Sequence, residues 1–185
     1  RLVGSEMCIR HSAQLHAGID RASRLVDQLL TLSRLDSLDN LDDVEPITLA
    51  DLLQSAVLDI WHPAQQAGID IRLINHAPQV KRQGQPLLLS LLVRNLLDNA
   101  IRYSPRGSVV DVTLDARSFS VRDNGPGVDP EVLARIGERF YRPPGQDATG
   151  SGLGLSIVRR IAALHGMRVS LSNAAEGGFE VKVSW

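Results

Sequence analysis

The first clear pattern along the chain is a narrow apolar stripe over residues 11–36. Its hydrophobic positions recur at alternating steps of four and three, with charged residues between them, which predicts one long helix carrying a coiled-coil-like seam. The members of the seam are Leu15, Ile19, Ala22, Val26 and Leu29. So short a seam does not make a self-sufficient coiled coil, so we expect the helix to pack against partner helices. The alternative is a helix that lies on its own domain.

The helical pattern breaks in the acidic, turn-rich segment of residues 36–45, which ends at Pro46. Such a segment is typical of a linker. We therefore expect a domain boundary here, with residues 1–40 forming one part of the chain and residues 45–185 the other.

Beyond the boundary, helical and alternating patterns follow one another. Helices are predicted over residues 49–67 (with Gly68 as the stop), 86–103, a short stretch after Pro130, and about 152–166, and strands over residues 69–74, 109–114, 119–122, 169–171 and 179–185. The order predicts an α/β (α+β) two-layer sandwich, with helices on one face of a mixed sheet.

Composition narrows the class of protein. The 185 residues are 43% hydrophobic and 22% charged, with a net charge of −1, which favours a folded domain and gives no general attraction to nucleic acid. The single Cys8 excludes an internal disulfide, and its thiol is expected to be inert. No run approaches the roughly 20 apolar residues of a membrane-spanning helix, so we expect no membrane contact by this chain.

Candidate chemistry begins on the predicted helix 86–103. Its apolar face is formed by Leu89, Leu92, Val93, Leu96, Leu97, Ala100, Ile101 and Tyr103. Asn95 and Asn99 lie one turn apart at the border of that face, with Arg102 nearby. Two amide oxygens can hold Mg²⁺ beside phosphates without adding negative charge. Read alone, the two asparagines could equally be solvated or capping residues.

Two glycine-containing motifs follow. The first, residues 123–127 (DNGPG), places Asp123 at the end of a strand, where a buried carboxylate can accept from an exocyclic amino group such as that of adenine; read alone, it is a plain turn. The second, residues 150–155 (GSGLGL), opens a helix, where successive N–H groups can converge on phosphate. Its late position, after a long loop, argues against a dinucleotide-binding turn.

Between these motifs lies a segment rich in Gly, Pro and Arg, residues 127–149. A loop of this length is usually functional or disordered. It contains Arg139, Phe140, Tyr141 and Arg142, so we expect a lid whose arginines close on phosphate.

The order of asparagine helix, Asp-x-Gly-x-Gly turn, Phe-Tyr-Arg lid and glycine nest resembles the N, G1, F and G2 boxes of the sensor histidine kinase catalytic domain. This domain belongs to the GHKL superfamily, shared with gyrase, Hsp90 and MutL, and has the Bergerat ATP-binding fold. The resemblance covers nearly everything after His16, and Gly177-Gly178-Phe179 resembles a weaker final glycine box.

The resemblance implies ATP and Mg²⁺ as cofactors. It implies magnesium and phosphate contact by Asn95 and Asn99, adenine recognition by Asp123, and catalytic phosphate contact by Arg142. The other nucleotide-binding residues that it implies are Arg102, Tyr103, Gly125, Gly127, Gly150, Ser151, Gly152, Leu153, Gly154 and Leu155, with the five glycines acting as lid hinges.

The resemblance also implies partners and a location. The helix over residues 11–36 resembles the second helix of a dimerisation and histidine-phosphotransfer bundle, so a homodimer and the protein's own dimerisation domain are expected partners, together with a response regulator. The expected location is the cytoplasmic portion of a bacterial inner-membrane protein.

Asn95 separates two branches of the superfamily. In the ATP-hydrolysing branch a glutamate stands at this position and acts as general base toward water, whereas an amide cannot take the proton. The sequence therefore predicts phosphoryl transfer to a side chain, with slow ATP hydrolysis.

The acceptor itself is not apparent. In the family it is a histidine followed by an acidic residue and then proline, and none of His11, His16, His62, His76 or His165 has that context. Each is expected to be an ordinary structural or surface residue. Residues 1–10 do not fit the family pattern. We therefore expect a chain that binds ATP without phosphorylating itself. The alternative is a non-catalytic nucleotide- or protein-binding module.

Overall fold

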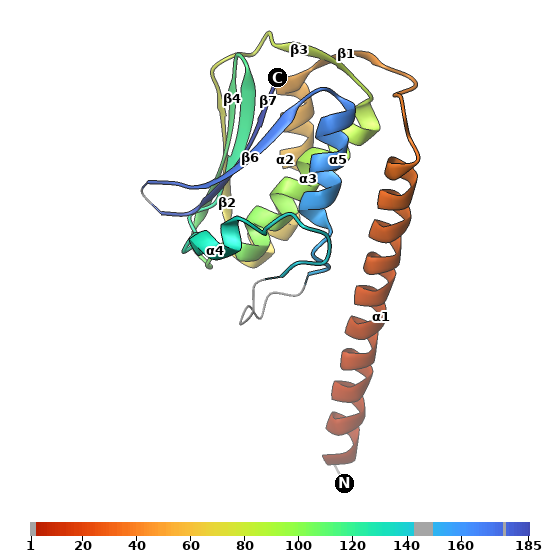
Figure 1. The fold of residues 1–185 in the computed structure, drawn as a ribbon. Helices are drawn as coiled ribbons and strands as arrows, with labels where there is room; N and C mark the ends of the chain where they lie inside the picture. The colour runs from red at the N-terminus through yellow and green to blue at the C-terminus, as the bar shows by residue number, and fades with distance from the viewer. Residues whose placement is uncertain (1–2, 143–149, 176) are drawn as a thin grey trace. The chain divides into compact units, whose positions relative to one another are not determined.

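The computed structural model describes residues 3–142, 150–175 and 177–185, and its chain divides into two compact units, Arg1–Ser37 and Leu38–Trp185. The first unit is a single helix, α1 (Val3–Asp36), of 34 residues. The helix predicted over residues 11–36 is thus confirmed, and it begins earlier than predicted (Figure 1).

A five-stranded sheet forms the centre of the second unit. The strands, in their order across the sheet, are β2 (Asp70–Asn75), β4 (Val109–Asp115), β5 (Ser118–Arg122), β7 (Phe179–Ser184) and β6 (Arg168–Asn173). Strands β2 and β4 are parallel and every other neighbouring pair is antiparallel. The sheet is mixed, as predicted.

Three helices cover one face of this sheet: α2 (Leu49–Ala67), α3 (Pro86–Tyr103) and α5 (Gly154–Leu164) (Figure 1). The short helix α4 (Pro130–Leu133) follows the loop after β5, and the Asp129 side chain caps it by accepting from the N–H of Glu131 at 2.9 Å. The predicted two-layer arrangement is confirmed.

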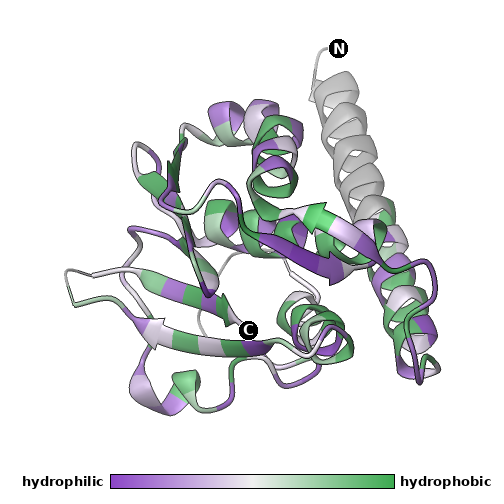
Figure 2. Cartoon of the chain, turned by 90° about the horizontal axis from the view of Figure 1, so that it is seen from above, coloured by the Kyte–Doolittle hydropathy of each residue, from purple (hydrophilic) through white to green (hydrophobic). Residues whose placement is uncertain are grey.

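The core lies between the helices and the sheet. Polar and apolar residues alternate along the strands (Figure 2), so each strand turns one apolar row toward the helices. The fully enclosed side chains include Leu89, Leu92, Val93, Leu96 and Leu97 of α3, Val110, Val112 and Leu114 of β4, Phe119 and Val121 of β5, and Ile157, Val158 and Ile161 of α5. Ile101 and Tyr103, predicted on the same face of α3, are only half-buried.

The helix ends lie where the sequence punctuates them. Gly68 caps α2 with φ of 71°, in the left-handed region that favours glycine, and a Cβ there would lie 2.8 Å from Arg106 Cγ. Pro86 opens α3, and Ser104, which precedes a proline, ends it.

Two short strands were not predicted. β1 (Glu45–Thr48) and β3 (Lys81–Gly84) form a separate antiparallel pair. The expected linker therefore ends before Glu45, and the assignment of Glu45 and Pro46 to it is wrong. The sequence shows no alternating apolar pattern here, because the first strand contains a proline and the second has the polar sequence KRQG. Pro46 is tolerated because each strand of a two-stranded ribbon has a free edge, where no N–H donor is needed.

The start of the second unit is held by α5. The Arg160 guanidinium donates through Nη2 to the carbonyl oxygen of Leu38 at 2.7 Å. The first residue after the α1 unit is thus fixed to the same helix that begins in the glycine-rich motif.

Candidate nucleotide site

The two asparagines of α3 face the beginning of α5. Asn95 is 8% exposed, and its Nδ2 donates to the carbonyl of Leu91 at 2.8 Å, which leaves Oδ1 as the outward acceptor. A Cβ on Gly154 would lie 3.3 Å from Asn95 Oδ1 and 3.3 Å from Asn99 Nδ2. The absence of a side chain at position 154 therefore lets the first turn of α5 approach both amides.

The same place is the positive end of a helix. The N–H groups of the first turn of α5 have no intrahelical partner, so the helix start attracts anions such as phosphate. Neutral amide oxygens beside such an anion fit a hard cation like Mg²⁺, whose charge is balanced by the phosphate. Among the described residues there is no group of three or more His, Cys, Asp and Glu that could hold a metal ion.

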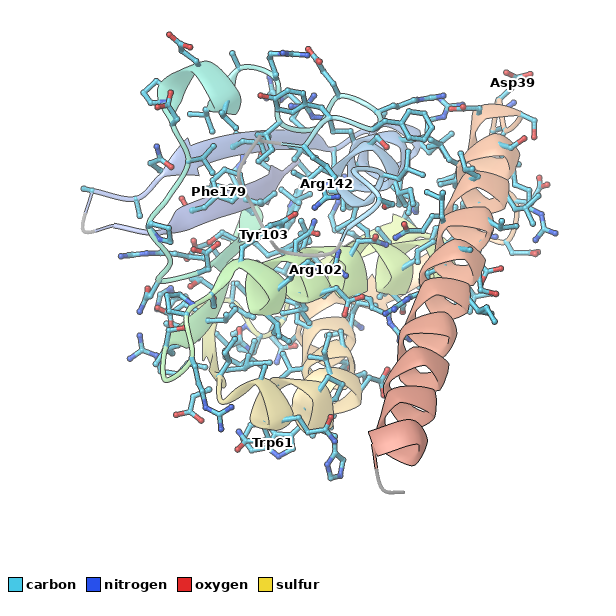
Figure 3. The ribbon with its side chains drawn as sticks, turned by 90° about the horizontal axis from the view of Figure 1, so that it is seen from below. Asp39, Trp61, Arg102, Tyr103, Arg142 and Phe179 are labelled. Atoms are coloured by element: carbon cyan, nitrogen blue, oxygen red, sulfur yellow. The ribbon has the colours of Figure 1, made fainter. Side chains whose placement is uncertain are left out.

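Arg102 and Tyr103 also meet the glycine-rich motif. A Cβ on Gly150 would lie 2.9 Å from Arg102 Nη1 and 3.6 Å from Tyr103 Oη. Figure 3 draws Arg142 over the same region, between α3 and α5, whereas Trp61 lies on the outer side of α2. A cationic group and a phenol thus flank the stretch where phosphate was predicted.

Leu153 and Ser151 of the glycine-rich motif stabilise the fold itself. The Leu153 side chain is completely buried, so this residue can meet a ligand only through its backbone. Ser151 Oγ accepts from the N–H of Leu153 at 3.1 Å and thereby shapes the turn into α5.

Asp123 lies at the end of β5 and is 5% exposed. Its Oδ1 accepts two backbone hydrogen bonds, from Gly125 at 2.9 Å and from Phe179 at 3.1 Å. Burial raises the pKa of the Asp123 carboxyl, against the opposing effects of these two N–H groups and of the Arg122 guanidinium. With Oδ1 engaged, Oδ2 is the oxygen that can accept from a ligand.

The glycines around Asp123 are required by close packing. Gly178, with φ of 94°, lies so close to the backbone of Asp123 that no Cβ fits there. Gly127, with φ of 76°, lies against Asn173. The final glycine box, which the sequence indicated only weakly, is thus part of the scaffold around the aspartate.

The described part of the segment predicted to be a lid contacts α5 and the glycine-rich motif. Arg159 Nη2 donates to the carbonyl of Ile136 at 3.3 Å, and its guanidinium leaves no room for a Cβ on Gly137. The N–H of Phe140 donates to the Gly152 carbonyl at 3.1 Å. Residues 143–149 of the predicted lid lie outside the described residues.

His165 joins the end of α5 to the start of α3. The N–H of Gln85 donates to His165 Nε2 at 3.1 Å, so Nε2 must be unprotonated and Nδ1 carries the proton that it donates to Ile161 O at 2.8 Å. Burial lowers the pKa of this imidazole, partly opposed by the Ile161 bond. The structural role expected of His165 agrees with this geometry.

Sequence reasoning missed the contacts of Asn173, Arg159 and His165. None of these residues belongs to a local motif, because each partner is far away in the chain.

In the part of the chain that the structure describes, no helix is long and apolar enough to cross a membrane.

Comparison with known proteins agrees with this arrangement. Residues 84–185 match the model of the histidine kinase-, DNA gyrase B- and HSP90-like ATPases. The chain belongs to this family, and its second unit carries an ATP-binding domain with the predicted GHKL fold.

Particular relatives are sensor kinases. The chain is 76% identical to the sensor protein QseC of Salmonella typhimurium over 187 aligned positions, covering 100% of the chain and 42% of that protein. It is 78% identical to QseC of Escherichia coli K12 over 172 residues, covering 93% of the chain and 38% of that protein. The chain thus spans about two-fifths of these relatives.

Solved structures give the same result. The cytoplasmic segment of histidine kinase QseC superposes with a TM-score of 0.66 at 64% identity, covering 90% of this chain and 93% of that one. Full-length ShkA in complex with AMPPNP gives a TM-score of 0.80 at 27% identity, covering 94% of this chain and 37% of that one.

Proposed function

We propose that this chain is the ATP-binding catalytic part of a QseC-type sensor histidine kinase, which transfers the γ-phosphoryl group of ATP to a histidine of its dimerisation domain. The phosphoryl group then passes to an aspartate of a response regulator. The observation that carries the proposal is the group of Asn95, Asn99 and Gly154, where two amides meet the positive end of a helix.

Each part of the nucleotide has a matching group. Adenine is recognised through Asp123 Oδ2, the carboxylate oxygen that is not bonded to the Gly125 and Phe179 N–H groups. The triphosphate lies along the start of α5 and is contacted by Arg102, Tyr103 and Arg142. Mg²⁺ is held by the oxygens of Asn95 and Asn99, with the phosphates supplying the remaining charge.

An amide in place of a carboxylate at position 95 favours phosphoryl transfer over hydrolysis. Asn95 uses Nδ2 to donate to Leu91 and has no proton-accepting carboxylate. The neighbouring Asp98 is half-exposed and lies 3.9 Å from Arg94, one turn earlier on the helix. On the described part of α3, a water molecule therefore finds no general base at position 95 or 98, whereas the lone pair of a neutral histidine nitrogen attacks phosphorus without one.

The apolar seam of α1 supports a homodimer. Ile19 is 66% exposed and Val26 is 52% exposed, so two members of the predicted stripe are available to other helices. We assign this helix to a dimerisation and phosphotransfer bundle, and the whole chain to the cytoplasmic portion of an inner-membrane kinase.

The test is nucleotide binding in the presence and absence of magnesium. A fluorescent ATP analogue should bind with Mg²⁺ dependence, and Asp123→Ala should lose that binding while remaining folded. The alternative function, a protein-binding module with a vestigial site, predicts no binding to the well-folded chain.

A further inference from the structure

The turn between β6 and β7 lies beside the loop that carries the adenine-binding aspartate. In the sheet, Asn173 of β6 is paired with Phe179 of β7, and the N–H of Asp123 donates to the Phe179 carbonyl at 3.0 Å. Asn173 of β6, Phe179 of β7 and Asp123, the residue directly after β5, therefore form one row. The turn itself is closed by the N–H of Ala174, which donates to the Gly178 carbonyl at 3.0 Å.

From the end of that row, the Asn173 side chain reaches to the far end of the aspartate loop. Its Nδ2 donates to the Val128 carbonyl at 2.6 Å, and its Oδ1 accepts from the Val128 N–H at 2.8 Å. One amide thus satisfies both backbone groups of Val128, as a neighbouring strand would. Gly127 makes this approach possible, because a Cβ there would lie 3.0 Å from Asn173 Oδ1.

The loop of residues 124–128 is therefore fixed at two ends. At its start, Gly125 donates to Asp123 Oδ1, and at its end Val128 is bonded twice to Asn173. We expect release of the far end to let the loop move and to weaken the bond between the Gly125 N–H and the carboxylate. Asp123 would then be less firmly held in its orientation.

We propose that Asn173 is a positioning residue for purine selectivity, holding the loop so that the Asp123 carboxylate is aimed at the 6-amino group of adenine. The inference rests on the proposed function of Asp123 and adds the residue that keeps it oriented. Asn173 itself does not touch the nucleotide.

The chemistry requires an amide at this position. Aspartate would keep an acceptor for the Val128 N–H but would place a second oxygen against the Val128 carbonyl, where a donor now lies at 2.6 Å. Alanine would remove both bonds. Because Asn173 is exposed at the end of a strand, neither change opens a cavity in the core.

The experiment compares the affinity of this chain for ATP with that for purine riboside triphosphate, which lacks the 6-amino group. The variants are Asn173→Asp and Asn173→Ala, with Asn75→Asp as the matched control. Asn75 lies at the end of β2 and its Oδ1 accepts from the Ala77 N–H at 3.1 Å, a bond that aspartate retains with the same change in charge.

The wild type and Asn75→Asp should prefer ATP by about tenfold or more, since a site built to accept from an amino group rejects a ligand without it. Both Asn173 variants should bring the ratio of the two affinities close to one. If Asn173→Asp does not fold, the ratio of the two affinities is measured on Asn173→Ala alone.

An unchanged ratio of the two affinities in the folded Asn173 variants would overturn the proposal, and if both affinities fall by the same factor the change indicates general loosening. If the wild type binds neither nucleotide, or binds both equally, the proposed role of Asp123 fails first and the inference with it.

Discussion

The replacement of Asp123 by asparagine should change nucleotide binding and leave the fold intact, because it alters only one terminal atom of the side chain. The two residues have the same shape, so the asparagine Oδ1 can still accept from the N–H groups of Gly125 and Phe179, which now bond the carboxylate at 2.9 and 3.1 Å. The change falls on the other terminal atom, where an oxygen that accepts becomes an NH₂ group that donates. That group would oppose the amino group of adenine.

The expected loss of affinity follows from the bond removed. A hydrogen bond to a charged group contributes about 1.5–3 kcal/mol, and each 1.4 kcal/mol is about tenfold in affinity. Asp123→Asn should therefore weaken ATP binding about 10- to 100-fold.

Stability should change in the opposite direction. Burial raises the pKa of Asp123, so the fold favours the protonated carboxyl over the ionised one. The stability that this group contributes is present below its unfolded-state pKa of about 4 and is lost as pH rises through its folded-state pKa. Asparagine is neutral at every pH, so at pH 7 the variant should melt at the same temperature as the wild type or higher.

Calorimetric titration with Mg-ATP and thermal melts at pH 7 measure the two quantities on the same protein. A variant that binds ATP as tightly as the wild type would refute the assignment of Asp123 to adenine. A variant that melts well below the wild type would refute the account of the buried carboxylate.

Three further predictions concern other parts of the site. Since burial lowers the pKa of His165, its neutral form stabilises the fold above pH about 6.5, and that stability is lost as pH falls through the folded-state pKa. Urea unfolding from pH 8 to 5 should therefore show a loss of stability that His165→Gln reduces and that the exposed control His62→Gln leaves in place. Gly154→Ala should keep the thermal stability, since alanine suits a helix, yet weaken Mg-ATP binding by about tenfold or more, because its Cβ would lie 3.3 Å from both amides; equal affinity in titration would contradict the arrangement. Steady-state ATP hydrolysis, followed by phosphate release, should be slow, and a vigorous turnover that Asn99→Ala abolishes would argue against a transferase.

The sequence predicted the elements that are marked by local chemistry. Gly68, Pro86 and the Ser104–Pro105 step set helix ends by backbone restrictions that act within a few residues, and those ends were placed correctly. β1 and β3 carry no such signal, because their pairing depends on a partner about forty residues away and not on an alternating pattern.

The same distinction applies to the candidate site. The asparagines, the aspartate turn and the glycine nest could be found because each motif is contiguous, and the structure brings the asparagines of α3 to the start of α5. The side-chain burial of Leu153 and the two bonds of Asn173 to Val128 depend on tertiary packing. The ligand-binding roles of the asparagines, of Asp123 and of the glycine-rich motif remain predictions that the experiments above test.

Several residues along helix α5 each make a contact with a different part of the second unit. Gly154 leaves room for the two amides, Arg159 bonds the loop at Ile136, Arg160 bonds Leu38, and His165 joins the helix end to Gln85. Neighbouring positions of a helix point about 100° apart, so the insertion or deletion of one residue would turn one arginine into the direction of the other and separate the remaining contacts. Homologous sequences should therefore vary in the composition of this helix far more than in its length.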